Sequence, residues 1–201
     1  MSDPVKKRSK LDDLEQVQVH SRAELRAWLE ANHASHGPVW LISYKKHHDD
    51  YLAWDDIVEE VLCFGWIDSQ ARKLDADRSM LYLSPRKAGS NWSGINKRRI
   101  ARLEKAGLMT AAGRAVIKRA KQDGTWTILD DVEALVIPDD LTALLDTDPE
   151  ARANFEAYPK SAKMGFLWWI KSAKTEATRT KRLDGTLRAA QQDVRVPGQA
   201  K

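Results

Sequence analysis

The sequence has very little cysteine, since Cys63 is the only one among its 201 residues. A single cysteine excludes an internal disulfide and any metal or redox site built on paired cysteines. Cys63 follows VEEVL at the end of an apolar helical face. That position is more typical of a small buried hydrophobic residue than of a nucleophile.

Long hydrophobic runs are also missing. No apolar run approaches the roughly 18 residues of a membrane-spanning helix. The basic start, MSDPVKKRSK, is not followed by the apolar segment of a secretory signal. We therefore predict a cytoplasmic protein without a membrane span.

The common nucleotide, hydrolase and metalloprotease motifs GxGxxG, GxxxxGK[ST], GxSxG and HExxH are absent as well. Four histidines are close in the chain, but their spacing fits no recognised metal site; they are His33, His36, His47 and His48. The sequence therefore predicts no metal and no cofactor. Whether the protein is an enzyme stays open, because no recognised catalytic motif is present.

Charge and tryptophan are plentiful. The chain is 31% charged with a net charge of +4, and it contains eight tryptophans. Residues 86–105 and 160–182 are rich in Lys and Arg, whereas residues 128–156 are rich in Asp and Glu. These blocks fit either helices with solvated outer faces or a shared basic groove for phosphate or carboxylate.

Local patterns predict α+β architecture. A helix is expected at 21–32, because Ser21 and Glu24 have the spacing of a capping box. A second helix is expected at 54–64, with Trp54 as the first residue of its inward face and Gly65 at its end. Residues 39–45 form a predicted strand, and residues 66–74 and 79–84 a hairpin. Ser90 or Asn91 is expected to cap the next helix.

The C-terminal part is predicted to be helical. After a helix capped by Thr110, further helices are expected at 139–146, 149–157, 161–173 and 176–191. The helix with Trp168 and Trp169 is expected to be the central packing element of this half. Together these elements predict a small antiparallel sheet with flanking helices, packed against an all-helical C-terminal half.

Four segments follow from this prediction. Residues 1–18 form a flexible N-terminal arm, and residues 19–125 an α+β core. Residues 126–192 form a helical segment that shares the core, and residues 193–201 a flexible tail.

The stretch 63–96 holds the candidate site. Asp68 follows a helix C-terminus, where the dipole disfavours a carboxylate, so a cationic partner is expected among Arg86, Lys87 and Lys45. SNWS at a helix start fits either simple capping or an anion site. The candidate ligand-binding residues are Trp66, Asp68, Arg86, Lys87, Ser90, Asn91, Trp92 and Asn96. Asp68 is also the one candidate catalytic residue, as a general base.

Several of these segments resemble a known family. RAWLEANH, VWLISYKK, VEEVLCFGWIDSQARKLD, SPRKAGSNWSGIN, KAGLMTAAG and DGTW are similar to the YdeI/OmpD-associated family, also called bacteriocin-protection proteins. YPKSAKMGFLWWIKSAKTEATRTKRL resembles the family's C-terminal helical segment, so the resemblance covers roughly residues 18–190. Ala53 departs from the Thr that is common in the family. The resemblance implies a small soluble bacterial protein and supplies no catalytic residues.

Three function classes remain. The first is an accessory protein for stress or bacteriocin tolerance that binds an anionic small molecule or protein partner near residues 86–96. The second binds nucleic acid through helices 94–105 and 160–182. The third is an enzyme in which Asp68 acts as a base on an anionic substrate.

Overall fold

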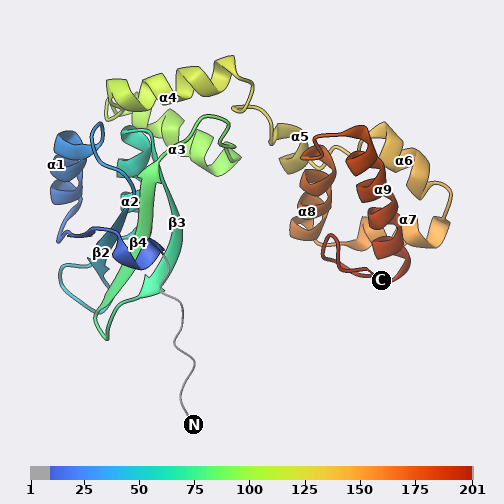
Figure 1. The fold of residues 1–201 in the computed structure, drawn as a ribbon, viewed down its shortest axis with the longest axis horizontal. Coiled ribbons are helices and arrows are strands. Elements are labelled where there is room, and N and C mark those ends of the chain that lie inside the picture. The colour runs from blue at the N-terminus through green and yellow to red at the C-terminus, as the bar shows by residue number, and fades with distance from the viewer. Residues whose placement is uncertain (1–9, 201) are drawn as a thin grey trace, which may run out of the picture. The chain divides into compact units, whose positions relative to one another are not determined.

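The computed structural model describes residues 10–200, which form two compact units that divide between Trp126 and Thr127 (Figure 1). The first unit combines a sheet with helices and the second is wholly helical, so the predicted α+β class with a helical C-terminal half is confirmed. Buried hydrophobic side chains form two clusters, one in each unit. Residues 1–9 of the predicted arm lie outside the described residues.

The sheet has four strands in the order β1-β2-β4-β3, namely β1 (Gln16–Gln18), β2 (Val39–Tyr44), β3 (Trp66–Lys73) and β4 (Arg78–Pro85). The β2–β4 and β3–β4 pairs are antiparallel as predicted, but β1 adds a parallel edge. β1 was not predicted because only one of its three residues, Val17, is buried. Residues 10–18 therefore belong to the fold.

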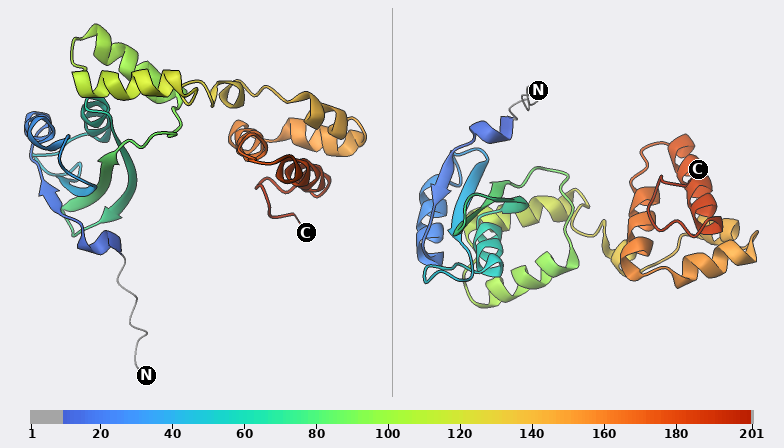
Figure 2. Two further views of the ribbon diagram at one scale, coloured as in Figure 1. Left: turned by 45° about the horizontal axis from the view of Figure 1, so that its top comes forward. Right: turned by 90° about the horizontal axis from the view of Figure 1, so that it is seen from below.

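Both faces of the central strand β2 are covered. On one face α1 (Arg22–Asn32) and α2 (Trp54–Cys63) pack beside the curved sheet (Figure 2). On the other face the 3-10 helix η1 (Lys10–Asp13) covers Trp40, whose Nε1 donates to the carbonyl of Leu11 at 2.6 Å. Arg72 lies 4.7 Å from the Trp40 ring and pairs with Asp12 at 2.7 Å.

Local signals set the ends of α1 and α2. Ser21 Oγ accepts from the N–H of Glu24, and Glu24 Oε2 accepts from the N–H of His20. Gly65 has a φ of 73°, as expected for a glycine that ends a helix. Trp54 was expected to point inward but is 50% exposed.

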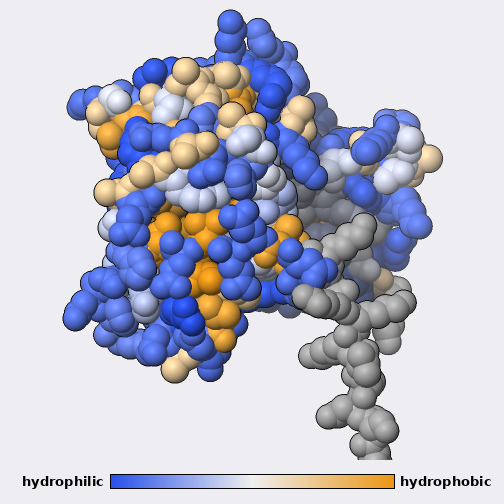
Figure 3. Space-filling model, turned by 60° about the vertical axis from the view of Figure 1, so that its left-hand side comes forward, coloured by the Kyte–Doolittle hydropathy of each residue, from blue (hydrophilic) through white to orange (hydrophobic). Residues whose placement is uncertain are grey.

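The remaining helices of the first unit are α3 (Gly94–Lys105) and α4 (Ala111–Gln122). Thr110 caps α4 as predicted, whereas Ser93 rather than Ser90 or Asn91 caps α3. Ile95, in the first turn of α3, is 54% exposed. In the space-filling view, apolar side chains form a strip bordered by hydrophilic ones (Figure 3).

The second unit contains the short helix α5 (Asp130–Glu133) and α6 (Asp139–Leu145), α7 (Pro149–Ala157), α8 (Lys160–Lys171) and α9 (Glu176–Gln191). α9 contacts α6, α7 and α8, so α9 and not the tryptophan-bearing α8 is the central helix. The segment after α9 packs onto this unit. Tyr158 Oη donates to the carbonyls of Ala189 and Val194, at 3.0 and 2.9 Å.

Within residues 10–200, no helix has the length and apolar character that a bilayer crossing requires.

Candidate functional site

The predicted Arg86–Trp92 corner is closed by its own side chains. Arg86 is 4% and Trp92 is 1% exposed. The Arg86 guanidinium carbon lies 3.8 Å from the Trp92 ring centroid, and Arg86 Nη1 donates to the carbonyl of Asn91 at 2.8 Å. Arg86 therefore covers the indole face that was expected to hold a ligand.

Burial makes Arg86 an unusual cation. Removal from water lowers its pKa to about 10, and the charge of Asp68 opposes that change. Its Nε and Nη2 atoms have no hydrogen-bond partner among the residues that the structure describes. The crevice between Arg86, Lys87, Ser90 and Arg119 has no space for a water molecule. In this conformation the corner is a packing motif and not an open cavity.

The polar residues around this corner bond locally. Ser90 Oγ donates to the carbonyl of Lys87 at 2.7 Å, as in a turn. Asn96 Oδ1 accepts from Arg99 Nη1 at 3.0 Å within α3. Lys87 is exposed.

Trp66 and Asp68 lie at the start of β3. Trp66 is buried, with its Nε1 3.2 Å from the carbonyl oxygen of His33 and its ring edge-on to Trp28. Asp68 Oδ2 accepts from Trp54 Nε1 at 3.2 Å, which is an indole partner in place of the expected ion pair. Lys45, one expected partner, donates instead to the carbonyls of Asp75 and Ala76.

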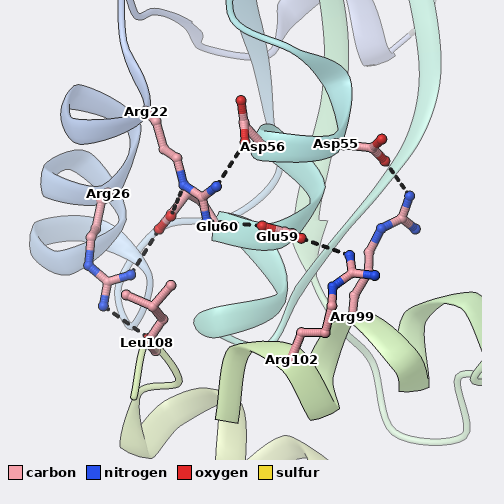
Figure 4. A network of polar contacts seen from close by, with 9 residues as sticks. All are labelled: Arg22, Arg26, Asp55, Asp56, Glu59, Glu60, Arg99, Arg102 and Leu108. Atoms are coloured by element: carbon pink, nitrogen blue, oxygen red, sulfur yellow. Dashed lines mark hydrogen bonds and ion pairs between the residues drawn. The ribbon is translucent and has the colours of Figure 1, made fainter. Parts of the chain in front are cut away.

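The most extensive charged cluster was not predicted and joins three helices (Figure 4). Acidic residues of α2 meet arginines of α1 on one side and of α3 on the other. The pairs are Arg22 with Asp56, Glu59 and Glu60, Arg26 with Glu60, Arg99 with Asp55, and Arg102 with Glu59. Since each arginine already faces a carboxylate, the cluster ties helices together and offers no free cation to a ligand.

Metal ligands do not gather. Within the described part of the chain, no group of three or more His, Cys, Asp or Glu side chains is arranged to hold a metal ion. His47 pairs with Asp77 at 3.1 Å, and His48 stacks on Tyr44 at 3.7 Å.

An open basic cavity lies in the second unit, and we call it the α9 cleft. It has a volume of about 520 Å³, within the range of roughly 300–1,000 Å³ that is typical of ligand pockets. It is lined by Trp169 of α8, by Thr178, Lys181, Arg182, Gly185 and Arg188 of α9, and by Gly198 and Ala200 after α9. Thr178, Lys181, Gly185 and Arg188 follow at intervals of three or four and so share one helix face, and Arg182 lies next to it.

The cations of the α9 cleft differ in how they are held. Arg182 is fixed, because its Nη1 donates to the carbonyl of Trp169 and to Ser172 Oγ. Lys181 and Arg188 are exposed and have no ion-pair partner among residues 10–200. Among residues 10–200, no carboxylate side chain lines the cleft. These features give a region of uncompensated positive charge beside an indole.

Gly185 is needed for this arrangement. A Cβ at Gly185 would lie 3.0 Å from Cη2 of Trp169, so glycine allows the indole to approach α9 closely. From the sequence, residues 160–182 were expected to be basic and Trp169 to belong to a packing helix. The available signal was a glycine on the same helix face as Lys181 and Arg188.

Comparison with known families agrees with the division into two units. Residues 134–193 match the family model described as Bacteriocin-protection, YdeI or OmpD-Associated. This match lies within the C-terminal unit. Residues 17–116, which contain the GWIDS and SNWS motifs, match a separate model, a domain of unknown function (DUF8412). No curated protein and no solved structure matches the chain. The YdeI/OmpD-associated segment includes every helical residue that lines the α9 cleft.

Proposed function

We propose that this protein is a small accessory protein whose YdeI/OmpD-associated unit binds a phosphorylated or polycarboxylate ligand in the α9 cleft. The observation that carries the proposal is a cavity lined by Lys181, Arg182 and Arg188 and, within the described part of the chain, by no carboxylate side chain. The proposal places the predicted anion recognition in the second unit.

The charges of the cleft favour a multiply charged anion. Three cations within two turns of α9 concentrate positive potential in a concave space, where partial exclusion of water strengthens each interaction. Arg182 is already oriented by two hydrogen bonds, so it loses little freedom when it binds an oxyanion. Trp169 adds an apolar wall that suits a planar group on the ligand.

As part of this proposal, we take the biological role from the family that residues 134–193 match. A ligand-binding accessory role in stress or bacteriocin tolerance fits the family name, and the cleft lies in the matched segment. We also propose a cytoplasmic location, which cell fractionation tests. The one cysteine is buried and free, as is common in a reducing compartment.

Nucleic-acid binding is the alternative function, but ion pairs within the protein compensate several of the basic side chains that it would use. Arg99 and Arg102 of α3 face Asp55 and Glu59. In the second block, Lys171 pairs with Asp131. Fewer cations are therefore free to contact phosphates than the sequence indicated.

Isothermal titration calorimetry with adenosine 5′-monophosphate, inorganic phosphate and adenosine tests the proposal. We expect both phosphate-containing probes to bind, the nucleotide more tightly, and adenosine to bind most weakly. Raising the salt concentration should weaken binding, because exposed charges are screened. If neither phosphate nor the nucleotide binds at low salt, the proposal is wrong.

Matched variants locate the site. Lys181→Ala combined with Arg188→Ala removes two exposed cations and should abolish binding while the melting temperature stays unchanged. Lys174→Ala removes an exposed cation outside the cleft and should bind like the wild type. Equal loss of binding in both proteins would show a diffuse charge effect and would overturn the assignment.

A further inference from the structure

We infer that a second cavity, in the first unit, binds a small aromatic ligand that carries a hydroxyl or carboxylate substituent. The cavity is a groove of about 310 Å³ between the start of α2 and the hairpin end of the sheet. This site is separate from the α9 cleft, and neither depends on the other.

The groove exists because small residues replace large ones along one sheet face. Across the β2–β4 pair, Val39 faces Leu83 and Leu41 faces Leu81, and these four side chains are in the core under the helices. The next pair on the same face is Ser43 with Ser79. On β3, Ala71 lies opposite Leu81 and also lines the groove. Small side chains at the end of the sheet therefore leave room that leucine would fill.

Ser43 is the observation that points to a ligand. It is only 6% exposed and lines the groove, yet its hydroxyl has no hydrogen-bond partner within residues 10–200. The hydroxyl opens onto the groove, where a polar group of a ligand can take the place of water. A polar substituent placed between Ser43 and Ser79 would satisfy it.

Exposed aromatic side chains form the rim of the groove. Tyr51 is 42% and Trp54 is 50% exposed. The Trp54 indole is held from two sides, by Asp68 at its Nε1 and by the Arg99 guanidinium carbon 5.2 Å from the ring. An exposed indole that is already oriented provides a flat surface for a ring at little entropic cost.

Charge and size define the ligand class. Lys45 and Lys46 line the groove, and no carboxylate among the described residues 10–200 does. Lys45 is engaged by two carbonyl groups, which leaves exposed Lys46 for a negative substituent. The volume is near the lower end of ligand pockets, so one or two fused rings fit. These features favour a neutral or singly negative aromatic ring.

A titration of 15N-labelled full-length protein with 4-hydroxybenzoate tests the inference. We expect a Kd of about 1 mM or tighter, with shifts at the Trp54 indole N–H and the Ser43 amide. Cyclohexanecarboxylate has the same charge without the ring and should bind about 10-fold more weakly. Benzylamine has the ring with a positive charge and should not shift these signals. Failure of 4-hydroxybenzoate to shift them, or equal binding of all three probes, would overturn the inference.

Two groove variants and one control complete the test. Ala71→Leu should fill the groove and weaken binding about 10-fold. Gln70→Leu introduces the same leucine side chain at an exposed neighbouring residue outside the groove and should bind normally. Tyr51→Ser removes an aromatic wall from a loop and should also weaken binding. Because Tyr51 is exposed, this variant gives a result even if Ala71→Leu disturbs the sheet. Unchanged binding in Tyr51→Ser and Ala71→Leu would overturn the inference.

Discussion

Replacing Glu60 with glutamine should destabilise the first unit by about 2–3 kcal/mol. Glu60 is 2% exposed and accepts from Arg22 Nε at 2.6 Å and from Arg26 Nη1 at 3.0 Å. Removal of one partner from a buried ion pair costs about 3–5 kcal/mol. The two arginine side chains are 33% and 29% exposed and keep other partners, so hydration recovers part of that loss.

Glu30→Gln is the matched control for Glu60→Gln. Glu30 pairs with the same Arg26, at 3.3 Å, but its side chain is 59% exposed. An exposed pair of this kind contributes about 0.5 kcal/mol or less. The two carboxylates therefore differ in burial, while their shared partner, Arg26, is the same.

Urea unfolding, followed through the indole N–H signal of buried Trp66, measures both variants in the first unit. We expect the loss for Glu60→Gln to persist in high salt, because buried charges are poorly screened. The small loss of stability in Glu30→Gln should become smaller in high salt, because this exposed pair is screened. If the two variants differ by less than about 0.5 kcal/mol, burial does not determine the strength of this cluster and the reasoning is refuted.

Three further predictions concern glycine, thiol and carboxylate groups. Gly65→Ala and Gly107→Ala both place alanine at a φ near 70°, which costs about 1–2 kcal/mol. Only at Gly65 does the new Cβ also clash with a side chain, that of Val116 at 2.6 Å. Gly65→Ala should therefore be less stable in urea by a further 1–3 kcal/mol or so, and equal losses would contradict the packing argument. Burial raises the pKa of Cys63 to about 11, so the neutral thiol stabilises the fold below an unfolded pKa of about 8.5. That stability should fall as the pH rises toward 11, and a Cys63→Ala variant should lack the decline. The Arg179 guanidinium lowers the pKa of Asp140, so its stabilisation is present above about pH 4 and lost below it. Far-UV circular dichroism should show a smaller loss of helix on acidification in Asp140→Asn.

The secondary structure could be predicted well where its causes are local. The strand Val39–Tyr44 and the hairpin follow from β-branched and apolar residues between turns. The caps at Ser21 and Thr110 follow from side-chain oxygens that accept from nearby backbone N–H groups. Each of these signals lies within a few residues of the feature that it determines.

Features that depend on distant contacts could not be predicted in this way. β1 has one buried residue and forms only because β2 pairs with it. The segment after α9 carries no helical pattern and is placed by the hydroxyl of Tyr158. Ser90, Asn91 and Ser93 are all residue types that cap helices, so residue type alone did not indicate that Ser93 is the N-cap of α3.

The same limit explains why the candidate sites differ from the predicted one. Trp92 was expected to face a ligand and is buried beneath Arg86, whereas Trp54 was expected in the core and is exposed. Helical periodicity assigns Trp54 inward, but it is the first residue of α2, where no preceding turn covers its side chain. Asp68 and Arg99 then hold the indole at the surface. A tryptophan at a helix start therefore has to be judged by the polar partners that the fold brings to it, and here those partners come from β3 and α3.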